Sequence, residues 1–184
     1  DVVLRSSPVQ VGALTTWTSI VVAREHVLAL KSDGTLWSWG MNSVGQLGLG
    51  DVVNRSSPVQ VGTLTTWTSI GGGQRHFGAI KSDGTLWTWG YNPQGQLGHG
   101  DATYRSSPVQ VGTLTTWTSV SVASIALHTV ATKSDGTIWA WGRNTSGELG
   151  LGNVANRNSP VQVGTLTSWT SAPKGGFTHT LALN

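Results

Sequence analysis

The chain of 184 residues contains no cysteine, which excludes disulfide bonds and metal sites built from thiolate ligands. Charge is scarce as well, because Asp, Glu, Lys and Arg together make up only 10% of the sequence. The only two glutamates, Glu25 and Glu148, stand at unrelated places, so no pair of catalytic carboxylates is indicated. The six aspartates fall in predicted turns and repeat junctions, where short polar side chains stabilise the backbone.

The other functional classes that composition can exclude are nucleic-acid binders and membrane-inserted proteins. Eleven Lys and Arg against eight acidic residues give a formal charge of +3, but the basic residues are spread along the chain without a cluster. No apolar run approaches the roughly 20 residues of a membrane span. Glycine runs lack the lysine of a phosphate-binding loop, and no Ser-His-Asp set stands apart from residues that every repeat shares. We therefore expect no enzyme, no cofactor and no metal site.

Glycine and tryptophan are abundant, with 25 and 10 residues, and they recur in register. Residues 1–50 align with 51–100 without a gap, and 35 of the 50 positions are identical. A segment SDGTLWSWGMNSVGQLGLGD at 32–51 returns with few changes at 82–101 and 134–153. A period of 50 to 52 residues is typical of propellers and solenoids. We treat residues 1–184 as one repeat domain, divided into 1–50, 51–100, 101–152 and a partial repeat 153–184.

Each repeat is predicted to form four short strands and no helix. TTWTSI is rich in β-branched and aromatic residues, HVLALK is apolar on both faces, and the SDG turn joins it to TLWSWG. SPVQVG, with valines two apart, supplies the fourth strand. Four strands in this length make a propeller blade, and large tryptophan side chains would fill the space between blades. Sugar stacking and light absorption are the alternative roles for these tryptophans.

The pattern H-x-x-A-[LI]-K-S-D-G-T-L-W-x-W-G-x-N-x-x-G-Q-L-G-x-G-D resembles the repeat of the regulator of chromosome condensation family. The resemblance covers the whole chain, and it implies an all-β propeller of four-stranded blades, seven-bladed in known members. Characterised relatives include an exchange factor for a small GTPase, a secreted β-lactamase inhibitor and a plant ultraviolet photoreceptor. Such a range of roles means that the resemblance does not fix the function.

The chain carries only about 3.5 to 4 blades' worth of strands. We therefore expect a partial propeller, either part of a longer chain or completed between molecules. Open blade edges invite pairing with another strand, so a homo-oligomer is a further expectation.

Differences between the repeats indicate where a partner would bind. The segments between the first two strands differ most, and a second variable patch follows each Trp-x-Trp-Gly strand. Loops on a shared scaffold commonly carry recognition, although neutral drift also concentrates there. Our candidate partner contacts on one surface are Arg24, Glu25, Gln74, Arg75, Lys174 and Phe177. Tyr91 and Arg143 are expected on another surface.

A histidine opens the second strand of every repeat, at 26, 76, 128 and 179. Because the four side chains belong to different blades, we expect a repeated structural hydrogen bond and not a shared metal ion.

The most favoured function is a non-enzymatic scaffold for protein–protein interaction through the variable loops. One alternative is a structural protein that assembles into a fibre or sheath through open blade edges, and a second is a carbohydrate-binding module. The sequence does not fix the compartment, although it favours an extracellular or cell-surface site over the cytoplasm.

Overall fold

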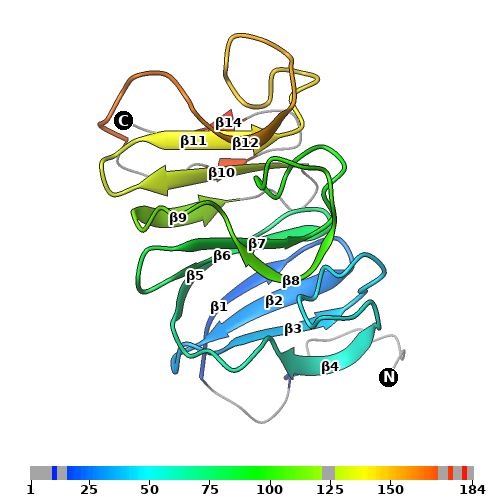
Figure 1. Ribbon diagram of the computed structural model, residues 1–184. Helices are drawn as coiled ribbons and strands as arrows, with labels where there is room; N and C mark the ends of the chain where they lie inside the picture. Colours follow the sequence, from blue (N-terminus) through cyan, green and yellow to red (C-terminus); the bar gives the residue numbers. More distant parts are fainter. Residues whose placement is uncertain (1–9, 12–15, 122–126, 170–173, 176–179, 182–184) are drawn as a thin grey trace.

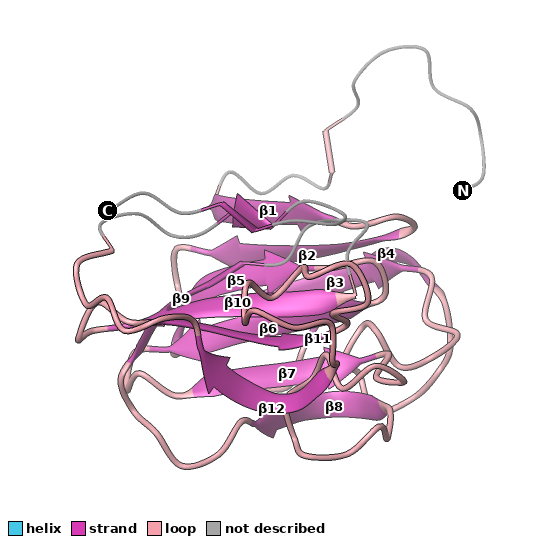
Figure 2. Cartoon of the chain, turned by 90° about the horizontal axis from the view of Figure 1, so that it is seen from above, coloured by secondary structure: helices cyan, strands magenta, loops and turns pink. Residues whose placement is uncertain are grey.

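The fold follows from a computed structural model that describes residues 10–11, 16–121, 127–169, 174–175 and 180–181, with side chains up to residue 169. Three four-stranded antiparallel sheets are stacked one above another along the chain (Figure 1). Seen from above, the described residues form strands and loops only (Figure 2). The expected all-β partial propeller is confirmed.

Within each blade the strands pair in chain order, so the blade is a simple meander. The first blade holds β1 (Trp17–Val22), β2 (His26–Lys31), β3 (Leu36–Gly40) and β4 (Arg55–Gln60). The second holds β5 (Trp67–Gly72), β6 (His76–Lys81), β7 (Leu86–Gly90) and β8 (Arg105–Gln110). The third holds β9 (Trp117–Ser121), β10 (His128–Lys133), β11 (Ile138–Gly142) and β12 (Arg157–Gln162). A short pair, β13 (Lys174–Gly175) and β14 (Thr180–Leu181), follows.

The predicted strands lie within two or three residues of the observed ones. The fourth strand is the main difference, because β4 begins at Arg55 and ends at Gln60, ahead of the valine that closes SPVQVG. That valine, Val61, instead donates its N–H to the carbonyl of Leu36 and is buried against the second blade. The first copy of the segment, at 7–12, lies outside the described residues except for Gln10 and Val11.

Tryptophans fill the space between blades, as predicted. Trp67 and Trp89 pack with Leu28 and Leu36 of the first blade, and Trp117 and Trp141 occupy the same places one blade later. All four side chains are at most 4% exposed. The first strand of each blade lies against its neighbours, since β5 contacts β1, β2 and β9. The blade interface is therefore the hydrophobic core of the molecule.

The Gly-Gln-Leu-Gly segment of the first and second repeats reaches across to the following blade. The Gln46 carbonyl accepts a hydrogen bond from Trp89 Nε1 at 3.1 Å, and Gly50 N–H donates to the Ser106 carbonyl at 2.8 Å. The next interface repeats the pattern, with Trp141 Nε1 2.9 Å from the Gln96 carbonyl. These hydrogen bonds to main-chain carbonyls fix how each blade sits on the next.

Inside the same loop, a buried asparagine holds the turns together. Asn42 donates through Nδ2 to the carbonyls of Asp51 and Val53, while its Oδ1 accepts from Leu47 N–H at 2.9 Å. Asn92 and Asn144 make the corresponding bonds in the later repeats. The three described repeats therefore build the same loop, because the asparagine side chain pairs main-chain groups that no neighbouring strand pairs.

The outer face of β1 exposes Ile20 and Val22 by 58% and 61%. At the same repeat positions in β5, Ile70 is half-buried and Gly72 is buried against the first blade. An apolar edge of this kind is what the predicted self-assembly would use, and that assembly stays a prediction.

The close approach of the blades gives a direct test of the loop's role. Gly45 and Gly62 both have left-handed φ angles, +78° and +64°, so alanine is strained at either position by about 1–2 kcal/mol. At Gly45 an added Cβ would also lie 2.5 Å from Ser106 Cα in the next blade, whereas at Gly62 it would meet nothing within 4 Å. We expect Gly45→Ala to lower the free energy of unfolding by more than about 3 kcal/mol in urea titrations, and Gly62→Ala by only the strain. Equal losses would contradict an inter-blade role for the loop.

Candidate interaction surface

The two sets of variable loops lie at the same end of each blade. The N–H of Tyr91, after β7, donates to the carbonyl of Arg75, before β6, at 2.9 Å. Met41 bonds Glu25 in the same way at 2.8 Å, and Arg143 bonds Leu127 at 2.9 Å. The expectation that Tyr91 and Arg143 stand on a different surface is therefore wrong. Antiparallel pairing brings the chain back to one end after the first strand and again after the third. We call this end the loop end.

Two tyrosines and an arginine meet on the loop end of the second blade. The rings of Tyr91 and Tyr104 lie 5.0 Å apart at 47°. Partial burial, followed by the neighbouring Tyr91, raises the pKa of Tyr104, while the nearby positive charge of Arg75 lowers it. Tyr104 remains 45% exposed. Tyrosine and arginine are the residue types that most often dominate protein interfaces.

Tyr104 was absent from the residues predicted as partner contacts. Its signal was present, because the residues just before Arg-Ser-Ser-Pro form a further variable patch, with Asn54 and Tyr104 at equivalent places. What the sequence alone could not supply is the 5.0 Å approach to Tyr91, since the two tyrosines are the first and last residues of the 14-residue connection between β7 and β8.

Arg24, Glu25 and Gln74 belong to the same end. Arg24 Nε lies 3.9 Å from Glu25 Oε1, and the two side chains are 56% and 45% exposed. A pair this exposed contributes little to stability, so both groups remain accessible. Gln74 is half-buried beside Arg75. Of the two remaining predicted contacts, Lys174 is described only as backbone in β13, and Phe177 lies outside the described residues.

Arg143 has an internal partner. Its Nε lies 3.4 Å from Oε1 of Glu148, whose side chain is 0% exposed, and 2.8 Å from Thr145 Oγ1. Glu148 replaces the glutamine of the other two repeats, and its Oε2 accepts from Ser146 N–H as Gln46 Oε1 accepts from Val44 N–H. The third repeat therefore differs by a coupled pair of residues. The Arg143 guanidinium therefore neutralises the buried Glu148 carboxylate, and this internal role makes it a weaker candidate for a partner contact.

The strand-opening histidines are buried at the blade interfaces. His76 Nε2 lies 3.0 Å from Thr129 Oγ1, and that hydroxyl donates to the Gln96 carbonyl at 2.8 Å, so Nε2 carries the proton. His26 meets Phe77 instead, with the rings 4.8 Å apart, and neither of its nitrogens has a hydrogen-bond partner among the described residues. The predicted repeated hydrogen bond is thus correct for His76 and wrong for His26. His179 lies outside the described residues.

Burial keeps both imidazoles neutral. It lowers the pKa of His26 to about 4, with a further contribution from the Arg75 charge. It lowers the pKa of His76 to about 3, where the neighbouring His128 and His26 add to the effect. Among the described residues, no three His, Asp or Glu side chains gather as metal ligands would. In that part of the chain there is also no helix long and apolar enough to cross a membrane.

Comparison with known proteins identifies the repeat. The regulator of chromosome condensation (RCC1) repeat matches residues 33–80, 83–132 and 135–183. A stretch of 36 residues is 50% identical to the ultraviolet-B receptor UVR8 of Arabidopsis thaliana, which is 20% of this chain and 8% of that receptor.

Two solved structures show the fold. Prp20p of Saccharomyces cerevisiae superposes with a TM-score of 0.80 over 92% of this chain and 44% of its own, at 23% identity. Human WBSCR16 gives 0.80 over 95% and 47%, at 22% identity. The chain thus spans less than half the length of these proteins, and at such identity the likeness establishes the fold alone.

The neutral histidines predict loss of stability on acidification. A histidine whose pKa is lowered in the folded state contributes its full stabilisation of the fold above its ordinary pKa of 6.5. This contribution is lost as the pH falls toward the pKa in the folded state. We expect the free energy of unfolding to fall by several kcal/mol between about pH 6.5 and pH 4, of which about 3 kcal/mol belongs to His26. In urea titrations across this window, His26→Leu should show a shallower pH dependence. An unchanged slope would refute the assignment to His26.

The coupled pair in the third repeat predicts a rescue. Arg143→Met should lower the free energy of unfolding by about 2–4 kcal/mol, because the buried Glu148 carboxylate loses its guanidinium. Adding Glu148→Gln recreates the Met41 and Gln46 combination of the first repeat, so the double variant should regain most of the loss. Chemical denaturation of the four proteins gives the coupling free energy. Additive effects of the two substitutions would show that they are independent.

Proposed function

The chain belongs to the regulator of chromosome condensation (RCC1) repeat family, and on that premise we propose that it is a non-enzymatic scaffold that binds a partner protein through its loop end. Protein binding is the activity described for a structural relative, since Prp20p of yeast binds Gsp1p and histones and has been seen with Kap60. The observation that carries the proposal for this chain is the cluster of Arg75, Tyr91 and Tyr104.

The cluster has the properties of an interface centre. Its two rings are held against each other, which limits the side-chain entropy lost when a partner binds. Among the described residues no ion pair involves Arg75, so the guanidinium is available for a carboxylate of the partner. Arg24 and Glu25 of the first blade extend the loop end with a second, exposed charged pair.

The chemistry of the described hydroxyl and imidazole groups supports the absence of catalysis. His76 and His99 each lie 3.0 Å from a threonine hydroxyl, Thr129 and Thr88. Both hydroxyls are buried and donate to main-chain carbonyls, at 2.8 and 2.7 Å. A nucleophile must donate its proton to a base and face the substrate, which neither threonine does.

Sugar binding receives less support from the tryptophans. In each blade a lysine ammonium lies 3.6 Å from the ring centroid of the partly exposed Trp37, Trp87 or Trp139. A pyranose would stack on these same faces. The lysine therefore competes with the contact that a carbohydrate-binding module needs.

A capture experiment with matched variants tests the protein-binding proposal. The chain is immobilised and exposed to an extract of its source organism, and retained proteins are identified by mass spectrometry and titrated individually. Tyr91→Ala with Tyr104→Ala should weaken a specific partner at least tenfold, because aromatic side chains at an interface centre contribute most of the affinity. Leu64→Ala with Leu114→Ala, two exposed residues at the opposite end, is the matched control. A partner that is lost equally with both double variants, or with neither, does not use the loop end.

A further inference from the structure

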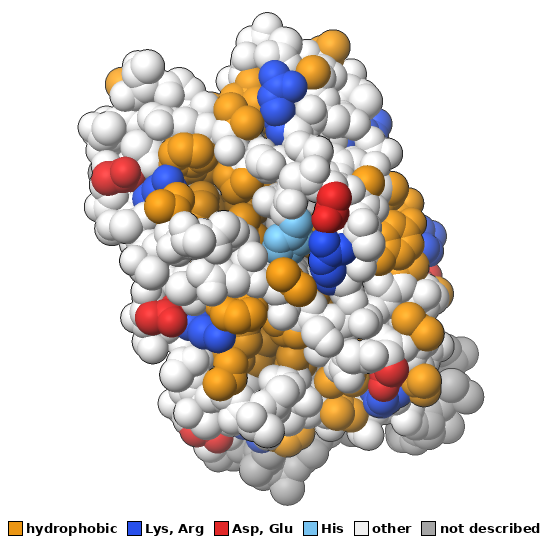
Figure 3. Space-filling model, in the orientation of Figure 1, with side chains coloured by type: hydrophobic (Ala, Val, Ile, Leu, Met, Phe, Trp, Pro, Cys, Tyr) orange, Lys and Arg blue, Asp and Glu red, His pale blue; other side chains and the backbone are white. Residues whose placement is uncertain are grey.

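A groove opens at each described blade interface, between the first strand of one blade and the Gly-Gln-Leu-Gly loop of the blade before it. The first groove, of about 290 Å³, lies between the first and second blades. Its lining includes Val61 and Leu64 from the segment before β5, Trp67 and Trp87 from the start of β5 and β7, and Pro108 of β8. Hollows floored by hydrophobic side chains, each beside basic and acidic residues, are visible on one face of the stack (Figure 3). The volume of the first groove suits one small apolar ligand.

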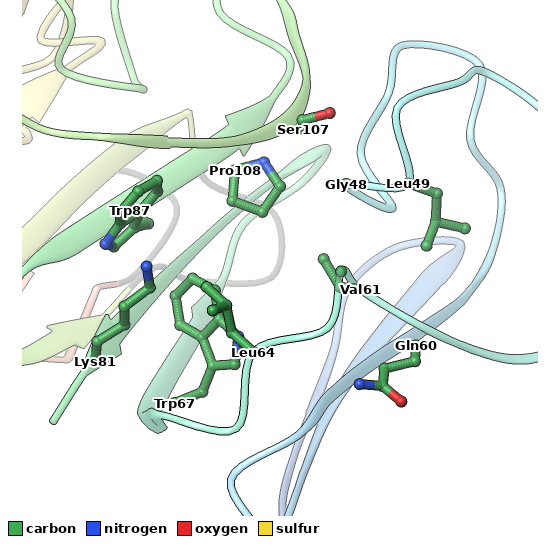
Figure 4. A pocket seen from close by; sticks show the side chains of 11 residues that line it. Gly48, Leu49, Gln60, Val61, Leu64, Trp67, Lys81, Trp87, Ser107 and Pro108 are labelled. Atoms are coloured by element: carbon green, nitrogen blue, oxygen red, sulfur yellow. The ribbon is translucent and has the colours of Figure 1, made fainter.

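The groove has a single cationic side chain in its wall, Lys81. Its Nζ lies 3.6 Å from the ring centroid of Trp87 and 5.1 Å from that of Trp67. Figure 4 shows the ammonium between these rings, with Pro108 and Val61 across the opening. Partial burial lowers the pKa of Lys81, with the nearby Asp83 opposing that effect.

Lys81 lacks a carboxylate partner within the described residues. The acid nearest in sequence, Asp83, directs Oδ1 to Thr85, accepting from its N–H at 3.0 Å and from its hydroxyl at 2.6 Å. The charge is therefore stabilised by the two indole faces and by the nearby charge of Asp83, without a direct ion pair among the described residues. An ammonium set beside apolar walls attracts an anion more strongly than one in open water, because the surroundings screen it less.

A second donor borders the same groove. Trp67 is 4% exposed, and its indole N–H has no acceptor among the described residues, whereas Trp87 Nε1 donates to Thr85 Oγ1 at 2.8 Å. A buried donor without an acceptor costs about 1–3 kcal/mol, and an incoming oxygen would remove that cost. The groove is thus bordered by an ammonium and by a residue whose indole N–H lacks an acceptor, two donor groups that suit an anion with two oxygens.

We propose that the groove between the first and second blades binds a small apolar monocarboxylate, with its carboxylate on Lys81 and Trp67 and its body against Val61, Leu64 and Pro108. The site is independent of the proposed protein-binding role, because neither Arg75 nor the two tyrosines line the groove. The next groove provides an internal comparison. It is larger, about 550 Å³, and carries His99 where the first has Leu49, while Lys133 lies 3.6 Å from the ring centroid of its Trp139 as Lys81 does from Trp87.

Titration with 3-phenylpropionate, followed by 15N NMR of the tryptophan indole groups and by calorimetry, tests the assignment. We expect a dissociation constant in the low millimolar range, with the Trp67 indole signal shifting most. The neutral 3-phenylpropanol and the cationic 3-phenylpropylamine should bind at least tenfold more weakly. Equal binding of the alcohol, or a larger shift at Trp117 in the second groove, would overturn the proposal.

Substitutions locate the charge. Lys81→Met keeps the apolar stem and should weaken 3-phenylpropionate about tenfold. Lys133→Met is the matched control, since Lys133 lies 3.6 Å from Trp139 in the next blade. As a second pair that leaves the lysines intact, Leu64→Trp should fill the groove and abolish binding, whereas Leu114→Trp should not. Equal effects of the two substitutions in either pair would overturn the site. Tighter binding of an acetylated Gly-Gly-Phe peptide than of 3-phenylpropionate would also overturn it.

Discussion

The hydrogen bond from the tryptophan indole of one blade to the glutamine carbonyl of the blade before it is the contact on which the stack depends. It joins Trp89 to Gln46 and Trp141 to Gln96 in a buried interface, where an unmade bond would be costly. The loop that presents the carbonyl is itself held by a buried asparagine. The residues that recur in this loop are therefore those that position the glutamine carbonyl oxygen, and the variable residues surround them on the loop end.

Strand positions and the stacking role of tryptophan could be predicted from the sequence because both rest on short-range patterns. A run that is apolar on both faces and the SDG turn after it place β2 at His26–Lys31, where the pattern predicted it. The fourth strand was less predictable. Arg55 and Ser56 are polar residues without alternation, and they are drawn into the ladder by pairing with β3, from Gly40 opposite Arg55 onward.

The candidate surface was harder to predict than the fold. Treating the two variable loops as separate surfaces overlooked that a meander returns to the same end every second connection. Tyr104 and Tyr91 form a contact that depends on the loop path, which no local pattern encodes. Arg143 looked like an exposed contact because its partner, Glu148, sits five residues away in a position normally filled by a neutral amide. Each error concerned a relation between residues, and no residue type was misjudged.

Because each described blade touches only the blades beside it, the stack is a linear array with nearest-neighbour coupling. Its stability is then approximately a sum over the blades and the interfaces between them. Nearest-neighbour coupling also bears on how such a chain evolves by duplication of its repeat. A copied unit of about 50 residues brings with it both halves of an interface, so the array can lengthen without redesign of the contacts already made.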